Sequence, residues 1–212
     1  MKAACLILAS ASPRRAHLMG KLGWDFDIVE AGVPEVLAPF LTARETAQLN
    51  AYRKAGAVAC LHPQALVLGA DTVVCLDDVM LGKPAHLDEA RAMLARLQGR
   101  SHQVITGVCM IQKSVNRQRL FAVTTQVCFR SLTGVQIDRY LASIDPLDKA
   151  GAYAIQEQGD WIVERIVGSF TNVIGLPMEQ LQTELQNWTP LGPGMRGGAF
   201  FPSSQGGASA SP

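Results

Sequence analysis

An apolar run near the N-terminus, residues 3–9, is followed directly by the sequence SASPRR. An apolar run of this length that ends in small polar residues predicts a buried β-strand. Ser12 suits the N-cap of a helix, and Pro13 suits its first position because proline lacks the N–H that would be unsatisfied there. Backbone N–H groups and the positive end of the helix dipole then point outward, beside the guanidinium groups of Arg14 and Arg15. This junction indicates either a site for phosphates or a capped helix with two solvated arginines.

Composition narrows the classes of protein to consider. The chain has 212 residues, of which 48% are hydrophobic and 17% charged. This indicates a compact globular protein with a real core, either one domain or two small lobes. The net charge of +1 gives no general attraction to nucleic acid or to an anionic membrane, so anion binding must be local. The five cysteines occur singly, which indicates buried thiols of a reducing compartment rather than disulfides or a zinc site.

The two ends of the chain need separate treatment. Residues 2–11 superficially match a very short signal peptide, but cleavage there would remove the first core strand, so export is not expected. No stretch approaches the ~20 apolar residues that a membrane span requires. We therefore expect a cytoplasmic protein without a membrane segment. Residues 1–190 are expected to form the folded domain, and 191–212, rich in Gly, Pro and Ser, a flexible tail.

Strand and helix patterns alternate along the domain. Helices are expected at about 13–22, 42–60, 88–97, 133–143 and 177–188, and strands at about 3–9, 26–29, 65–76, 79–81, 102–112, 120–130, 152–155 and 161–166. Two helices open with a capping box, in which Thr42 pairs with Glu45 and Thr133 with Gln136. Hairpins of long strands with helices between them predict an α/β or α+β layer fold with a mixed sheet.

Asp71 interrupts the most apolar of the expected strands. A carboxylate in such a strand is costly unless something pairs with it. Backbone N–H groups at a strand bend could satisfy it. Alternatively, Asp71 is a metal ligand or general base at the lip of a cleft, reached through a bend that Gly69 permits.

Other polar residues carry weaker signals. Lys54 follows small residues on a helix and points along a cleft or into solvent, and Lys83 is held in a stiff loop by Pro84. Glu35 is a loop carboxylate without a signal of its own. Gln156 follows the strand expected at 152–155, and its amide offers a donor and an acceptor side by side. That pair matches the N3–H and O4 of uracil or thymine, or else bonds to backbone.

Taken in order, short motifs along the chain resemble the Maf family of nucleoside triphosphate pyrophosphatases. The motifs are SASPRR, Lys54, GADT (69–72), GKP (82–84), GRSH…TGV (99–108), DKAGAY (148–153) and GSFTNVIGLP (168–177). The resemblance runs from about Ala4 to about Leu185. It implies a two-lobed, ITPase-like α/β fold with a central mixed twisted sheet, helices on both sides and a cleft between the lobes. It also implies a homodimer.

The same resemblance implies a reaction and a set of residues. Nucleoside triphosphates would be hydrolysed to monophosphate and pyrophosphate with a divalent cation, Mg²⁺, which Mn²⁺ or Co²⁺ could replace. The implied catalytic residues are Asp71, Glu35, Lys54 and Lys83; the metal ligands are Glu35 and Asp71; the phosphate-binding residues are Ser10, Ser12, Arg15, Lys54 and Lys83. Because a triphosphate carries about four negative charges, a cation and several fixed positive donors suit its cleavage.

Base specificity divides the family, and three positions bear on it. Arg14, Thr72 and Gln156 are similar to the branch that acts on dTTP and UTP, whereas the branch that acts on 7-methyl-GTP tends to have Trp, Gln and Glu there. Arg14 is therefore expected to affect base choice more than Arg15 does. Glu157 and Asp160 stand where the family usually has small residues, and they would repel phosphate if they faced the cleft.

Three other readings remain open at this point. The first is a pyrophosphatase of the 7-methyl-GTP type. The second is a non-catalytic nucleotide-binding regulator of cell division, against which the presence of every catalytic position counts. The third is a nucleic-acid-binding module, which the near-neutral charge and the lack of a basic, aromatic-rich stretch disfavour. We expect no nucleic-acid partner.

Overall fold

A mixed seven-stranded sheet forms the centre of the computed structural model, which describes residues 6–38 and 40–188. The strands are β1 (Leu6–Ala9), β2 (Phe26–Ile28), β3 (Leu66–Leu76), β4 (Val79–Leu81), β5 (Ser101–Gln112), β6 (Arg117–Phe129) and β7 (Val163–Val167). The sheet order is β2-β1-β3-β5-β6-β7, and β4 pairs with β3. β1 runs parallel to β2 and β3, and the remaining pairs are antiparallel. The expectation of a mixed α/β fold is confirmed.

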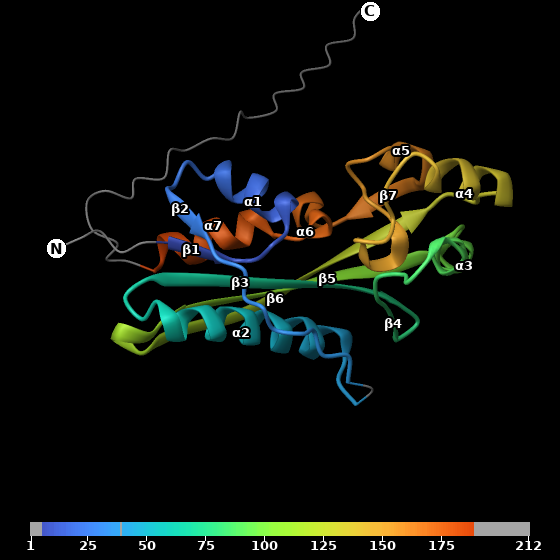
Figure 1. Cartoon of the computed structure of the whole chain (residues 1–212). Coiled ribbons are helices and arrows are strands. Elements are labelled where there is room, and N and C mark those ends of the chain that lie inside the picture. Colours follow the sequence, from blue (N-terminus) through green and yellow to red (C-terminus); the bar gives the residue numbers. More distant parts are fainter. Residues whose placement is uncertain (1–5, 39, 189–212) are drawn as a thin grey trace, which may run out of the picture.

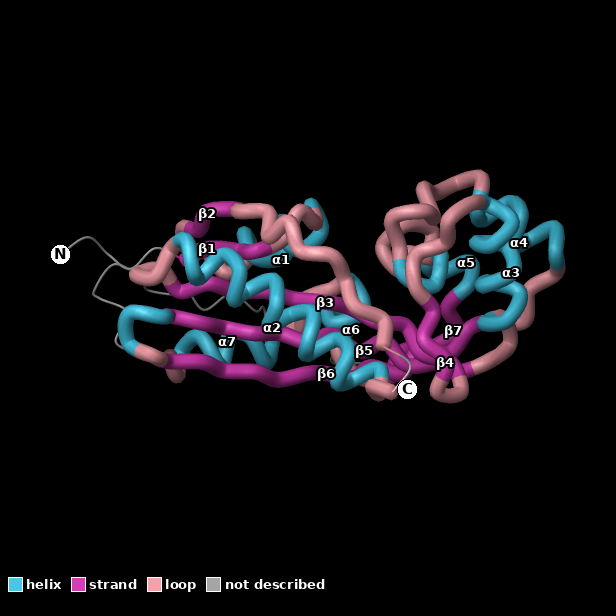
Figure 2. Tube along the Cα trace, turned by 60° about the horizontal axis from the view of Figure 1, so that its bottom comes forward, coloured by secondary structure: helices cyan, strands magenta, loops and turns pink. Residues whose placement is uncertain are grey.

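Helices cover both faces of this sheet (Figure 1). They are α1 (Pro13–Gly20), α2 (Ala43–Leu61), α3 (Leu87–Leu97), α4 (Gly134–Leu141), α5 (Gly159–Ile162), α6 (Phe170–Ile174) and α7 (Met178–Gln186), with 3₁₀ turns at Lys113–Val115 and Ala150–Ala152. α2 lies on one face, and α1, α6 and α7 lie on the other. The long strands β3, β5 and β6 continue into a second lobe that carries α3, α4 and α5 (Figure 2).

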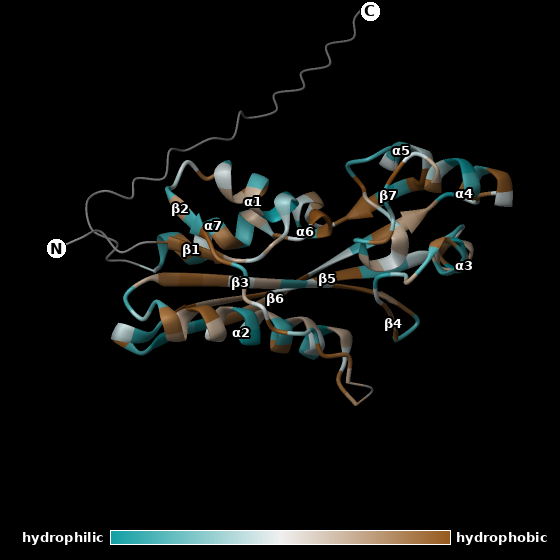
Figure 3. Ribbon diagram, viewed as in Figure 1, coloured by the Kyte–Doolittle hydropathy of each residue, from teal (hydrophilic) through white to brown (hydrophobic). Residues whose placement is uncertain are grey.

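Each lobe has its own buried apolar cluster. In the first lobe, Leu8 of β1, Leu68 of β3 and Leu181 of α7 belong to one cluster, and Ala51 and Ala55 of α2 belong to another on the opposite face. The first half of β3 is strongly hydrophobic where it lies between these layers (Figure 3). A further cluster fills the second lobe, including Leu94 of α3, Phe129 of β6 and Tyr140 of α4. The polar site described below lies between these cores.

Two glycines let α2 approach the sheet very closely. A Cβ atom on Gly69 would lie 2.5 Å from the carbonyl oxygen of Ala51, and one on Gly107 would lie 2.4 Å from that of Ala47. The bend expected at Gly69 is wrong, because β3 runs through this residue and pairs with β1 on one side and β5 on the other. Gly69 is needed for the space that it leaves to the helix, not for a bend in the strand.

Most of the expected elements are present within a few residues of their predicted bounds, and both capping boxes are confirmed. The strand expected at 152–155 is wrong. This segment follows a 3₁₀ turn, and the backbone N–H and carbonyl of Ala154 both bond to the Tyr140 hydroxyl instead of to a neighbouring strand. The strand expected at 161–166 begins as helix α5 and becomes β7 at Val163. α6 was not anticipated.

The other expectations about the chain have mixed outcomes. Cys75 and Cys109 are buried free thiols as expected, but Cys60 is exposed and Cys128 is half-buried. Among the described residues, no helix is both long and apolar enough to cross a membrane. The predicted tail at 191–212 and the start of the first strand lie outside the part of the chain that the structure describes.

Candidate functional site

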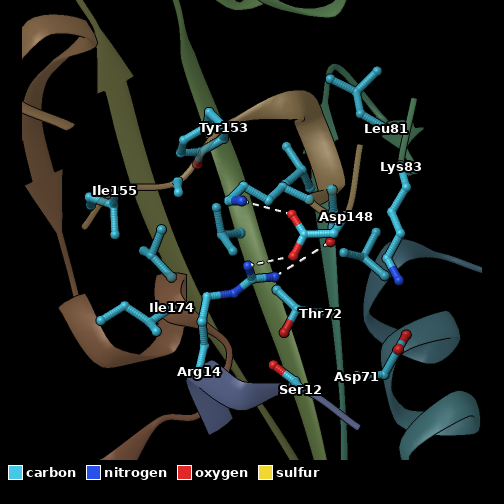
Figure 4. A pocket seen from close by; sticks show the side chains of 18 of the residues that line it. Ser12, Arg14, Asp71, Thr72, Leu81, Lys83, Asp148, Tyr153, Ile155 and Ile174 are labelled. Carbon is cyan, nitrogen blue, oxygen red and sulfur yellow. Dashed lines mark hydrogen bonds and ion pairs between the residues drawn. The ribbon is translucent and has the colours of Figure 1, made fainter. Parts of the chain in front are cut away.

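Two adjoining pockets hold all of the site residues expected from the sequence. The first, which we call the sheet pocket, is lined among others by Ser12, Arg14, Arg15, Glu35, Asp71, Thr72, Lys83 and Gln156. The second, which we call the loop pocket, is lined among others by Ser10, Ser12, Arg14, Arg15, Glu35, Lys54 and Lys83. The shared walls make these pockets one continuous site beside the N-terminus of α1. Figure 4 shows the sheet pocket, with Asp71 and Lys83 on one side and Tyr153 and Ile155 on the other.

Asp71 lies in the middle of β3 and pairs with side chains of α2. The Nζ atom of Lys54 is 2.6 Å from Oδ1 of Asp71 and 2.8 Å from Oε1 of Glu35. Nδ2 of Asn50 donates to the other oxygen, Oδ2 of Asp71, at 3.1 Å. The strand carboxylate is therefore satisfied by a lysine and an amide from the helix, not by backbone N–H groups at a bend.

Asn50 is a site residue that the sequence analysis missed. Its Oδ1 accepts from the N–H of Val36 at 2.9 Å, and its Nδ2 donates to the carbonyl of Val36 at 3.1 Å as well as to Asp71. These bonds hold the loop that carries Glu35 against the strand that carries Asp71. A buried amide one helical turn before Lys54, and so on the same face of the helix, is the signal that could have revealed it.

The two carboxylates titrate differently. Burial raises the pKa of Asp71 above its ordinary value, and the positive charges of Lys54 and Arg15 offset this only in part. Burial by itself would also raise the pKa of Glu35, but the hydrogen bond and charge of Lys54, with the charge of Lys83, hold that pKa below its ordinary value. A pair whose environments separate the two pKa values suits distinct roles as proton acceptor and permanent anion.

Arg14 and Arg15, adjacent in sequence, contact different partners. Nη1 of Arg14 is 2.8 Å from Oδ2 of Asp148 (Figure 4). Arg15 donates from Nε to the carbonyl of Gly175 at 2.9 Å and from Nη2 to Oγ1 of Thr72 at 3.0 Å. Burial lowers the pKa of Arg15, although the charges of Asp71 and Glu35 oppose this shift. The arginine in contact with Thr72 is therefore Arg15 and not Arg14.

The start of α1 has the capping geometry expected from the sequence. Ser12 is the N-cap, and its Oγ accepts from the N–H of Arg15 at 3.5 Å, with Pro13 at the first position of the helix. Oγ of Ser10 accepts from the N–H of Ser12 at 3.2 Å. Ser10, Ser12 and Arg14 line the loop pocket. The N–H groups of Arg15 and Ala16 are already bonded to Ser12, so the backbone N–H of Arg14 is the one that the first turn offers to a phosphate group.

An acidic and basic pair closes the second-lobe side of the sheet pocket. The buried Nζ of Lys149 is 2.7 Å from Oδ1 of Asp148, and the other oxygen of this carboxylate, Oδ2, binds Arg14. Glu157 lies 3.6 Å from the same Nζ, so Lys149 partly offsets its charge. Neither Glu157 nor Asp160 is among the residues that line the two pockets. The motif containing Asp148 and Lys149 was noticed in the sequence, but no role was assigned to either residue.

Two tyrosines, Tyr140 and Tyr153, hold the segment that carries Gln156 through hydrogen bonds of their hydroxyl groups. The Tyr140 hydroxyl bonds to both backbone groups of Ala154, and the Tyr153 hydroxyl lies 2.8 Å from Nε2 of the buried His102. The side chain of Gln156 is exposed at the rim of the sheet pocket. A loop fixed in this way presents the Gln156 amide from a rigid support.

The donor set fits a hard divalent cation. Glu35 and Asp71 both contact the Lys54 ammonium, so the two carboxylates converge on a region that accommodates one positive charge. Two carboxylates, completed by water and phosphate oxygens, are typical of a Mg²⁺ site next to a nucleotide. No cluster of three or more His, Cys, Asp or Glu residues suited to a metal occurs among residues 6–38 and 40–188. Glu35 and Asp71 are the residues that would hold such a cation.

Comparisons with known proteins show which family the chain is similar to. A family model described as Maf-like protein matches residues 5–188. A dTTP/UTP pyrophosphatase of Syntrophus aciditrophicus (strain SB) is 46% identical over 186 residues, which cover 88% of this chain and 91% of the relative. A dTTP/UTP pyrophosphatase of Bacillus velezensis is 44% identical over 183 residues, which cover 86% and 96%. A solved HAM1 protein from Coxiella burnetii is 16% identical, covering 87% of this chain and 99% of its own, with a TM-score of 0.47.

Proposed function

Because the chain belongs to the Maf family, we propose that it hydrolyses dTTP and UTP to the nucleoside monophosphate and pyrophosphate. The observation that carries this proposal is the convergence of Asp71 and Glu35 on Lys54 beside Arg15 and Lys83. An acidic pair next to fixed positive charges is the arrangement that cleavage of a polyphosphate requires.

The roles that we propose follow the positions of the side chains. Asp71, whose pKa is raised by burial, orients the attacking water and accepts its proton. Glu35 remains ionised and, with Asp71, would hold Mg²⁺, for which Mn²⁺ or Co²⁺ could substitute. When bound, this cation supplies positive charge to the phosphate oxygens. Lys54 holds the two carboxylates together and then binds phosphate.

The triphosphate is proposed to lie along the loop pocket. Arg15 and Lys83 would supply positive charge to its oxygens, and Ser10, Ser12 and the first turn of α1 would donate hydrogen bonds. The base would then reach the sheet pocket, where the Gln156 amide offers a donor and an acceptor to the edge of uracil or thymine.

Several further points belong to the same proposal. The folded domain is residues 1–190, in keeping with the family match at 5–188, and 191–212 is a tail. The protein acts as a homodimer in the cytoplasm on a small nucleotide, without a nucleic-acid partner. The family resemblance supports the homodimer, the singly placed cysteines support the cytoplasm, the net charge of +1 argues against a nucleic-acid partner, and the Gly, Pro and Ser content of 191–212 supports the tail.

The decisive experiment is an assay of pyrophosphate release. The purified protein is incubated with Mg²⁺ and, in turn, dTTP, UTP, CTP, GTP and 7-methyl-GTP, and the products are separated by ion-exchange chromatography. We expect monophosphate and pyrophosphate from dTTP and UTP, and loss of release in Asp71→Asn. Asp160→Asn, an exposed aspartate outside both pockets, is the matched control and should retain activity.

Two outcomes would contradict the proposal in different ways. Absence of pyrophosphate from every nucleotide, or unchanged release in Asp71→Asn, would exclude this enzyme activity and favour a non-catalytic nucleotide-binding protein. A strong preference for 7-methyl-GTP would leave the reaction intact but contradict the assignment of the base.

A further inference from the structure

Three polar residues continue inward from Arg15 as a buried chain of hydrogen bonds. Thr72 on β3 lies directly opposite Thr106 on β5, and their Oγ1 atoms are 3.0 Å apart. Oγ1 of Thr106 also donates to the backbone carbonyl of Asn172 in α6 at 2.9 Å. Thr106 and Asn172 are both 0% exposed, so water cannot replace either partner.

The direction of every proton in this chain follows from its two ends. The carbonyl of Asn172 can only accept, so it takes the single hydroxyl hydrogen of Thr106. Thr106 must then accept from Thr72. The hydroxyl hydrogen of Thr72 is then used in the bond to Thr106. Thr72 therefore accepts a hydrogen bond from Nη2 of Arg15, because a guanidinium nitrogen can only donate. The chain therefore runs from Arg15 through Thr72 and Thr106 to Asn172.

The far end of the chain is itself held rigidly. Nδ2 of Asn172 donates to the carbonyl of Val104 and to Oγ1 of Thr125, both at 3.0 Å. The near end is held at a second point, since Nε of Arg15 donates to the carbonyl of Gly175. Anchors at both ends leave one orientation for the Arg15 guanidinium between the two pockets.

On the basis of the proposed function, we propose that Thr106 and Asn172 are positioning residues that fix Arg15 and make Thr72 an acceptor only. With its hydrogen committed to Thr106, Thr72 has one lone pair left for a ligand. A group that binds there must be a donor. The N3–H of thymine or uracil qualifies as a donor that Thr72 shares with the Gln156 amide oxygen in the same pocket, whereas a phosphate oxygen or the unprotonated N3 of cytosine does not. The relay thereby contributes to the choice of base.

Three variants test this relay. Thr106→Val removes the hydroxyl but keeps the shape of the side chain, and Thr106→Ser keeps the hydroxyl. Thr46→Val is the matched control, because Thr46 is also 0% exposed and its Oγ1 has no hydrogen-bond partner among the described residues. For each variant, kcat and KM are measured with dTTP and with CTP.

We expect Thr106→Val to raise KM for dTTP about tenfold, which is the effect of losing one buried hydrogen bond. The thermal stability of each variant is measured as well, so that a loss of folding is distinguished from a change in KM. The ratio of kcat/KM for dTTP to that for CTP should also fall, because the freed Thr72 hydrogen can turn toward cytosine N3. Thr106→Ser should recover both values, and Thr46→Val should leave both unchanged. An equal loss for dTTP and CTP, or no recovery in Thr106→Ser, would overturn the proposal.

A second readout does not depend on catalysis. The hydrogens of a guanidinium that is held by two hydrogen bonds exchange slowly with water and give resolved NMR signals. The signals of Arg15 are identified as those that disappear in Arg15→Lys. Thr106→Val should accelerate exchange at Nη2 of Arg15, and Thr46→Val should not. Unchanged exchange in Thr106→Val would refute the relay even in an active enzyme. Accelerated exchange in a protein without pyrophosphatase activity would support the relay and contradict the proposed function.

Discussion

Lys54 and Asp71 form an ion pair with 2.6 Å between Nζ and Oδ1, although their side chains are only 12% and 6% exposed. Burying such a pair is costly unless the remaining polar atoms are also bonded. Here Asn50 satisfies the second oxygen of Asp71, and Glu35 gives Lys54 a second anionic partner. One ammonium thus serves two carboxylates.

Replacing Lys54 with methionine tests how far this ion pair sets the behaviour of Asp71. Without the positive charge, the pKa of Asp71 should rise further, so the acid limb of the pH–rate profile should move to higher pH. We also expect kcat/KM for dTTP to fall by about 100-fold. Lys21→Met, at an exposed lysine just after α1, should change neither value. An unshifted profile in Lys54→Met would show that Asp71 is not the titrating base.

The close contact between α2 and the sheet predicts a marked effect of added methyl groups. Gly69→Ala and Gly107→Ala would each place a Cβ against helix backbone, and each should lower the free energy of unfolding by about 3 kcal/mol or more. Gly56→Ala, on α2 itself, has nothing within 4 Å of the new Cβ and should be neutral or stabilising. Denaturant titration measures all three. Equal stability in the three variants would mean that the helix shifts away without cost.

The buried His102 predicts a loss of stability in mild acid. Burial lowers the pKa of His102 to about 4, below its ordinary value of 6.5. Between these two values the unfolded chain binds a proton that the folded protein does not, so stability falls as pH drops. The change between pH 7 and pH 5 should be about 2 kcal/mol. Denaturant titrations at several pH values give the free energy of unfolding as a function of pH. This free energy should depend less steeply on pH in His102→Gln than in the unchanged protein. An equal slope in that variant would contradict the assignment, and His17→Gln, at an exposed histidine, is the control.

The Tyr140 hydroxyl is predicted to stabilise the segment that presents Gln156. Tyr140→Phe leaves both backbone groups of Ala154 without their partner, which should cost about 2 kcal/mol of stability. Because Gln156 lies two residues further along, KM for dTTP should rise more than kcat falls. Steady-state kinetics and thermal unfolding measure the two effects, with Tyr52→Phe on the outer face of α2 as control. A change in stability with unaltered KM would show that the loop does not position the base.

The sequence alone was sufficient to predict elements whose signals are local. The N-cap of α1 at Ser12 and the capping boxes at Thr42 and Thr133 depend on residues three positions apart, and all are present. The strand expected at 152–155 failed because a buried loop and a buried strand share the same apolar pattern. The hydroxyl of Tyr140 bonds to the backbone N–H and carbonyl of Ala154, which therefore do not pair with a neighbouring strand.

The sequence also selected residues that line two adjoining pockets, because their order along the chain and their types were enough to pick them out, but it missed Asn50. The tertiary structure decided how they pair. α2 crosses β3 and β5 at two glycines, and this close packing brings Asn50 and Lys54 onto Asp71. The Thr72–Thr106 contact depends likewise on the register of β3 against β5. Such contacts join residues far apart in the chain, so they follow from packing and register rather than from any local pattern.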